Sequence, residues 1–134
     1  MAGVEKILLD TSAYSAFNRG DARLQPWFKS SLEICTPLIV IGELRAGFAA
    51  GSRRAENEAL LRRFLDAPNV SQLTLSATTT EHFAALYLKL RQGGVTVSTN
   101  DLWIAALSIE HNLAILSLDE DFSRIPGVRI VKFS

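Results

Sequence analysis

The sequence predicts an α/β domain with a central, mostly parallel sheet covered by helices on both faces. Short, continuously apolar runs predict buried strands, and segments with helical spacing of apolar residues lie between them. This alternation is typical of parallel α/β domains. The chain of 134 residues can form one continuous core, and no repeat or linker divides it. We therefore expect a single domain over residues 1–134.

The first elements follow one another with short turns. Lys6 to Leu9 is an apolar run that predicts a strand ending at Asp10. Thr11 or Ser12 can cap a helix that runs to about residue 18. Asp21 can cap a second helix over residues 21–29, and residues 34–36 are a strand candidate.

Helices predominate in the middle of the chain. Thr36 can cap a helix with Pro37 in its first turn, running to residue 50. Ser52 opens another helix that ends near residue 68, and the alternating pattern of residues 70–75 favours a strand. Thr78 and Glu81 make a capping box for a helix that extends to about residue 91.

The C-terminal third returns to the sheet. Thr99 or Asn100 can cap a helix over residues 101–111. Residues 113–118 and 128–131 are expected strands, with a short helical turn at residues 121–124 between them.

Composition indicates a folded cytoplasmic protein. A hydrophobic content of 48% and a charged content of 21% exclude a disordered chain. No apolar run approaches the roughly 18 residues of a membrane span, and the N-terminus lacks a signal-peptide pattern. Cys35 is the single cysteine, which excludes an internal disulfide and a cysteine-based metal site.

Four acidic residues lie near the points where expected strands end. Asp10 and Asp119 each follow an apolar run, Asp101 opens a helix, and Glu43 lies one to two turns into a helix. In open α/β sheets, ligands bind outside the carboxyl ends of the strands. We therefore expect these four carboxylates to converge on a hard cation, Mg²⁺ or Mn²⁺, which relieves their repulsion.

Each acid alone also has a plain structural explanation. Asp10 can be a turn residue, Asp101 can complement a helix dipole, and Asp119 can belong to a solvated charge run. Glu43 is harder to explain in this way, because an unpaired carboxylate in its apolar stretch would be costly. His82 and His111 lack any spacing that is typical of metal ligands.

The formal net charge is zero, which by itself argues against a nucleic-acid partner. If the four acids form one metal site, however, ten acidic residues remain against fourteen basic ones. Arg45 is a candidate phosphate contact, although the arginines of residues 45–63 could equally form a solvated face paired with Glu56 and Glu58. Trp27 or Trp103 could stack a base, but the apolar surroundings of Trp103 favour the core.

Four short motifs follow one another along the chain: Leu8-Leu9-Asp10-Thr11-Ser12, residues 42–47 (GELRAG), residues 100–106 (NDLWIAA) and residues 117–122 (SLDEDF). Together they resemble the PIN-domain nucleases, most closely the VapC-type toxins of type II toxin–antitoxin pairs. The resemblance implies a three-layer α/β/α sandwich, a homodimer and a cognate antitoxin. It also implies that the toxin is associated with DNA only indirectly, through the antitoxin.

The resemblance also implies a Mg²⁺-dependent endoribonuclease that leaves a 5′-phosphate and a 3′-hydroxyl. It places the metal-binding and catalytic acids at Asp10, Glu43, Asp101 and Asp119, with Asp121 as the alternative to Asp119. A metal-activated water attacks the phosphorus. Because an A-form duplex hides base edges in a deep groove, we expect the substrate to be a single-stranded loop of a structured RNA.

Other classes fit the sequence less well. A haloacid-dehalogenase phosphatase needs an acid where Ser12 stands, and neither a P-loop nor a serine-hydrolase elbow is present. The alternatives that stay open are a non-catalytic RNA- or protein-binding module and an RNA-processing nuclease outside a toxin pair.

Overall fold

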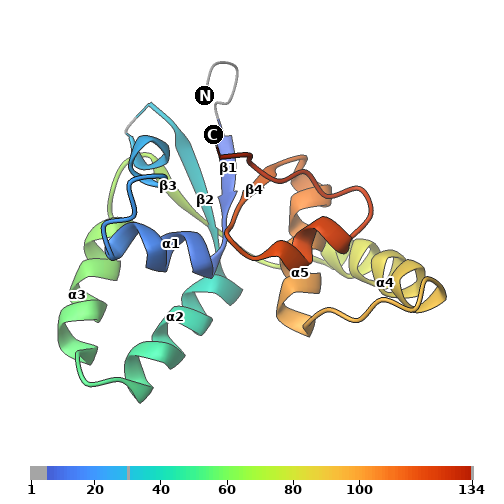
Figure 1. Ribbon diagram of the computed structural model, residues 1–134, viewed down its shortest axis with the longest axis horizontal. Helices are drawn as coiled ribbons and strands as arrows, with labels where there is room; N and C mark the ends of the chain where they lie inside the picture. Colours follow the sequence, from blue (N-terminus) through green and yellow to red (C-terminus); the bar gives the residue numbers. More distant parts are fainter. Residues whose placement is uncertain (1–5, 30, 134) are drawn as a thin grey trace.

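A computed structural model describes residues 6–29 and 31–133 (Figure 1). A parallel sheet has the strand order β3-β2-β1-β4. The strands are β1 (Lys6–Leu9), β2 (Glu33–Pro37), β3 (Val70–Leu73) and β4 (Ala114–Leu116). The predicted parallel sheet is confirmed. The prediction about a signal peptide concerns residues 1–5, which lie outside the described ranges.

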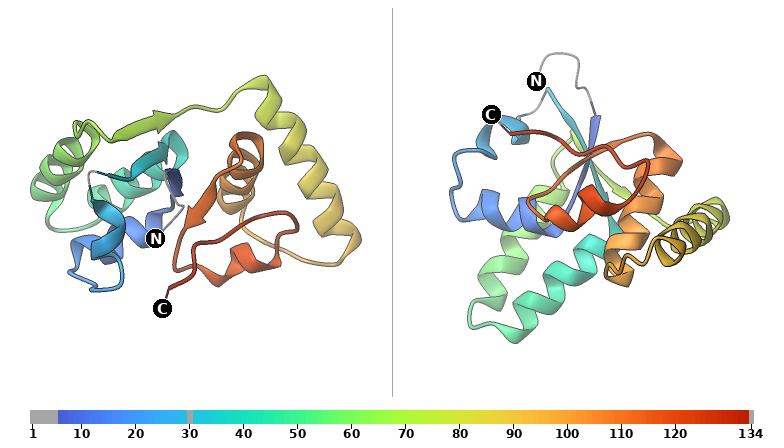
Figure 2. Two further views of the ribbon diagram at one scale, coloured as in Figure 1. Left: turned by 90° about the horizontal axis from the view of Figure 1, so that it is seen from above. Right: turned by 45° about the vertical axis from the view of Figure 1, so that its right-hand side comes forward.

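Helices cover both faces of the sheet. They are α1 (Thr11–Asn18), α2 (Leu38–Ala50), α3 (Arg54–Leu65), α4 (Ala77–Gln92) and α5 (Thr99–His111). The first three lie on one side and α4 and α5 on the other, so the domain has the three expected layers (Figures 1 and 2). None of the helices in residues 6–29 and 31–133 combines the length and hydropathy needed to cross a bilayer.

The core surrounds β1, which lies between β2 and β4. Ile7, Leu8 and Leu9 are fully buried. On the side of α1, the rings of Tyr14 and Phe64 pack edge to face with centroids 5.1 Å apart. A strand buried on both faces has little freedom to slide, because any shift would expose apolar surface. The residue that follows it, Asp10, is thereby held at the carboxyl edge of the sheet.

Two predicted elements are wrong. The helix expected over residues 21–29 is reduced to a 3₁₀ helix, η1 (Gln25–Phe28). Asp21 does not cap a helix, because its carboxylate accepts hydrogen bonds from the backbone N–H (3.0 Å) and the guanidinium (2.7 Å) of Arg23. The strand expected over residues 128–131 is reduced to one parallel bridge between Ile115 and Ile130.

The helix starts differ from those expected. Ser76 and Thr79 form the capping box of α4 in place of Thr78 and Glu81. Ser98 caps α5 by accepting the N–H of Asp101 at 3.1 Å, so the cap lies one or two residues earlier than expected. In stretches rich in serine and threonine, several neighbours can cap equally well, and tertiary packing selects among them.

Two further caps are also absent. Thr36 is fully buried, and its hydroxyl has no hydrogen-bond partner among the described residues; Pro37 occupies the N-cap position of α2. At α1 the N-cap position is Asp10, whose carboxylate makes no cap hydrogen bond. Thr11 and Ser12 lie inside the helix. The hydroxyl of Thr11 donates to Glu43, and that of Ser12 donates to Asp10.

Candidate metal centre

The candidate site lies at the carboxyl edge of the sheet. Asp10 is the residue after β1, and Asp119 follows the end of β4 at the start of the 3₁₀ helix η2 (Glu120–Arg124). Asp101 lies in the first turn of α5. Because β1 and β4 are parallel neighbours, their carboxyl ends bring the first two acids to the same edge.

Two serine hydroxyls hold the buried carboxylate of Asp10. Ser117 donates to Oδ2 at 2.7 Å, and Ser12 donates to the same oxygen at 3.0 Å. The serines in turn accept backbone N–H groups: that of Asp119 binds Ser117 at 2.9 Å, and that of Leu118 binds Ser12 at 2.9 Å. This network joins the ends of β1 and β4, and it directs the serine hydroxyls to Oδ2 rather than Oδ1.

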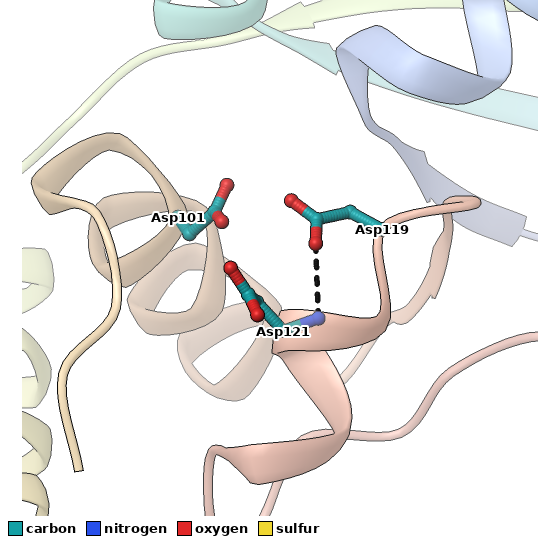
Figure 3. A group of neighbouring side chains, drawn as sticks. All are labelled: Asp101, Asp119 and Asp121. Carbon is teal, nitrogen blue, oxygen red and sulfur yellow. Dashed lines mark hydrogen bonds between the residues drawn. The ribbon is translucent and has the colours of Figure 1, made fainter.

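Three further carboxylates meet beside it. One oxygen each from Asp101, Asp119 and Asp121 can be chosen so that all lie within 4.8 Å of one another (Figure 3). The N–H of Asp121 also donates to Oδ1 of Asp119 at 2.9 Å, which fixes the turn that presents both acids. A set of carboxylate oxygens at this spacing fits a hard divalent cation, which prefers oxygen ligands.

The electrostatics of Asp101 support this interpretation. Its pKa is raised from 3.8 to about 7, first by burial and then by hydrogen-bonding and charge interactions with Asp119. The charge of Asp10 raises this pKa further, and the hydroxyl of Ser98 lowers it. The charges of Asp119 and Asp10 therefore disfavour a negative charge on Asp101, and a cation placed beside it would relieve this repulsion.

Glu43 borders this group without belonging to its tightest part. Its carboxylate accepts a hydrogen bond from the Thr11 hydroxyl at 2.9 Å, which links α2 to the first residue of α1. Half-burial and this hydrogen bond explain how the apolar stretch accommodates a carboxylate. The structure thus groups Asp101, Asp119 and Asp121, and it ties Asp10 to this group through Ser117 and through the effect of its charge on Asp101. Glu43 is linked to the site through Thr11, the residue that follows Asp10.

The sequence offered Asp119 and Asp121 as alternatives, with Asp119 preferred. Both carboxylates lie beside Asp101, so the geometry admits both as ligands. Ser117 was not predicted as part of the site. The sequence signal for it was a polar side chain at the end of an apolar run. In the structure Ser117 is only 5% exposed, so its hydroxyl needs a hydrogen-bond partner.

Other sequence candidates lie elsewhere. The guanidinium of Arg45 pairs with Glu58 at 3.3 Å, joining α2 to α3, and Arg53 pairs with Glu56. This is the solvated, paired face that was the alternative for these arginines. Trp103 stacks on Phe83 with ring centroids 3.9 Å apart, so its ring packs between α5 and α4.

The family model for the PIN domain matches residues 7–128, nearly the whole chain. Ribonuclease VapC4 of Mycobacterium tuberculosis is 31% identical over 134 residues, covering 96% of this chain and 97% of that protein. The chain belongs to the PIN-domain family, in its VapC branch. Ribonuclease VapC5 of the same organism is 30% identical, covering 93% of this chain and 91% of the relative.

Solved structures of VapC proteins share the fold of this PIN domain. VapBC2 of Rickettsia felis, bound to a DNA fragment from its promoter, superposes with a TM-score of 0.85 at 24% identity, covering 96% of this chain and 99% of that one. VapBC-5 of Mycobacterium tuberculosis gives a TM-score of 0.76 at 28% identity, with coverage of 95% and 98%. VapC20 of the same organism, a sarcin–ricin loop cleaving toxin, gives 0.68 at 25% identity, with coverage of 94% and 98%.

Proposed function

We propose that this VapC-type PIN domain is a Mg²⁺-dependent endoribonuclease and the toxin of a VapBC-type pair. The observation that carries the proposal is the group of Asp101, Asp119 and Asp121 beside the serine-held Asp10. Relatives that align over nearly the full length are named ribonucleases, which supports RNA as the substrate. We take residues 1–134 to act as one catalytic domain in the cytoplasm.

The residues have distinct parts in this proposal. Asp101 and Asp119 would hold the cation, Asp10 would complete the site through Oδ1, and Glu43 and Asp121 would extend it. A bound Mg²⁺ supplies the activation of a water and the neutralisation of charge on the leaving oxygen. Ser12 and Ser117 both bind Oδ2 of Asp10, which would leave Oδ1 for the cation. Mn²⁺ would substitute, because it accepts the same oxygen ligands.

The substrate we propose is a single-stranded loop of a structured RNA. An A-form duplex hides its base edges in a deep, narrow groove, whereas the unstacked bases of a loop are open to side chains. One relative of known structure is described as cleaving the sarcin–ricin loop, which supports this choice. An antitoxin partner is supported by solved VapBC complexes. We also propose a homodimer, which the resemblance to VapC-type toxins implies.

The test is to sequence RNA ends after controlled expression of the wild type, Asp10→Asn and Asp66→Asn. Asp66 is an exposed aspartate at the end of α3 and serves as a matched control. We expect new 5′-phosphate ends at a discrete site with the wild type and the control, and none with Asp10→Asn. Identical ends in all samples would instead favour a non-catalytic binding module.

A further inference from the structure

A cavity of about 460 Å³ adjoins the candidate metal centre. Ser117 and Asp119 line both the cavity and the acid group, so the two are continuous. Its other walls come from Arg23, from η2 and from residues 130–133. We call this cavity the C-terminal pocket. In Figure 2 the C-terminal segment runs back past η2 to this region. The volume falls in the range of about 300–1,000 Å³ typical of small-ligand sites.

The walls of the C-terminal pocket combine positive charge with apolar surface. Lys132 is exposed, and no carboxylate of residues 6–29 or 31–133 pairs with it. Arg23 lies over the ring of Phe133, 5.9 Å from its centroid, and is held there by its ion pair with Asp21. Ile130 continues the apolar wall, and Ser123 adds a polar residue to the lining.

We propose that the C-terminal pocket binds the nucleotide next to the scissile phosphate of a single-stranded RNA. Lys132 contacts a phosphate, while Phe133 and Ile130 pack against the base. This inference rests on the proposed function, and it identifies the nucleotide of the substrate that this chain binds outside the metal centre. Single-strand binding sites in general combine a cationic contact that follows the backbone with aromatic rings that pack on bases.

Continuity with the acids favours a nucleotide over an unrelated small ligand. An RNA chain whose phosphate reaches Asp119 must continue on one side or the other, and the C-terminal pocket is directly adjacent. Arg23 strengthens the wall, because its guanidinium plane can itself pack on a base. Glu120, which has no part in the proposed metal centre, repels phosphate where it lines the pocket, so the phosphate is expected near Lys132.

The test measures binding without cleavage. A fluorescein-labelled single-stranded RNA of mixed sequence and roughly 12 nucleotides is titrated with the full chain in EDTA, at several salt concentrations, by anisotropy. The variants are Lys132→Gln and Phe133→Leu, and the matched control is Lys89→Gln, an exposed lysine on α4 away from the pocket. Thermal unfolding of each variant checks that it is folded.

The two variants should weaken RNA binding in different ways. Lys132→Gln should weaken binding about tenfold and reduce the slope of log affinity against log salt by about 0.7, the value for one lost phosphate contact on a single strand. Phe133→Leu should weaken binding about tenfold with the slope unchanged, because stacking is uncharged. The control should stay within about twofold of the wild type.

Wild-type affinity and slope in both folded variants would overturn the pocket assignment, whatever the cleavage assay gives. If Phe133→Leu proves unstable, the salt slope of Lys132→Gln decides alone. The same proteins are then assayed for cleavage with Mg²⁺. Failure of the wild type to cut any RNA would overturn the proposed function, whereas the EDTA binding data test the pocket without requiring cleavage.

Discussion

The hydroxyl of Ser117 donates a 2.7 Å hydrogen bond to the carboxylate of Asp10, although the two residues are 107 positions apart. The same hydroxyl accepts the N–H of Asp119 at 2.9 Å, so one side chain positions two acids of the metal centre. Its position depends on β1 and β4 being parallel neighbours. Fold and candidate chemistry therefore meet at a residue that is not itself an acid.

Ser117→Ala should lower both stability and activity. It leaves Asp10 with one hydroxyl donor and the N–H of Asp119 without its acceptor, at a cost of about 1–3 kcal/mol in the free energy of unfolding. Urea unfolding measures this cost, and RNA cleavage should fall because the carboxylate is no longer held. Ser52→Ala, an exposed serine in the turn between α2 and α3, is the control and should stay within about 0.5 kcal/mol. Equal stability of both variants would contradict the role given to Ser117.

Asp101→Asn should stabilise the metal-free protein near neutral pH while abolishing cleavage. A buried carboxyl with a pKa of about 7 binds its proton more tightly when folded than when unfolded, where the pKa is 3.8. Its contribution to stability is therefore greatest at low pH and is lost as pH rises through the window from about 4 to about 7. The Asp101→Asn variant does not lose stability in this way, because asparagine carries no ionisable group.

The difference in unfolding free energy between Asp101→Asn and the wild type isolates this group from other titrations. In EDTA, the difference should grow in favour of the variant between pH 4 and pH 7. A full shift of about three pKa units corresponds to about 4 kcal/mol, and solvent screening reduces this to on the order of 2 kcal/mol. A flat difference across this range would show that burial and neighbouring charges do not perturb Asp101. Loss of folding in the variant would show that the acid is structural.

Much of the site was predictable because it depends on local order in the chain. Asp10, Asp101 and Asp119 were expected together since each lies where a strand ends or a helix begins, and a parallel sheet aligns these points. Ser117 was not expected, because its value depends on a long-range hydrogen bond. The bond between Thr11 and Glu43 likewise depends on the packing of α1 against α2.

The errors have similar physical causes. Residues 21–29 show acceptable capping chemistry for a helix, but Asp21 binds Arg23 instead and leaves only η1. Residues 128–131 are apolar enough for a strand, yet they meet β4 through a single bridge. In the first segment a local side-chain contact competes with the helix, and in the second the tertiary pairing limits the strand to one bridge.

Ser98→Ala should destabilise the fold by about 1 kcal/mol, the usual cost of removing an N-cap. The helix concerned is α5, which presents Asp101 to the centre, so the midpoint of chemical unfolding and the cleavage rate should both fall. Thr99→Ala is the matched control, because that residue is inside the helix and not its cap. If Thr99→Ala costs more than Ser98→Ala, the cap has been assigned to the wrong residue.

Glu43→Gln should affect metal binding less than loss of Asp101 does. The amide oxygen of glutamine can still accept the Thr11 hydrogen bond, so the junction of α1 and α2 should keep its stability. Glu43 lies outside the tightest group of carboxylates, so we expect a decrease in Mn²⁺ affinity smaller than about tenfold. Thermal unfolding with and without Mn²⁺ compares the two variants, and an equal loss would place Glu43 among the principal ligands.

The most direct test of the central claim is a calorimetric titration of Mn²⁺ and Mg²⁺ into the wild type, Asp101→Asn and the control Asp66→Asn at pH 7.5. We predict binding to the wild type and the control, with affinity reduced more than about tenfold in Asp101→Asn. Equal affinities in all three proteins, or no binding to the wild type at millimolar metal, would contradict a metal centre built from these carboxylates.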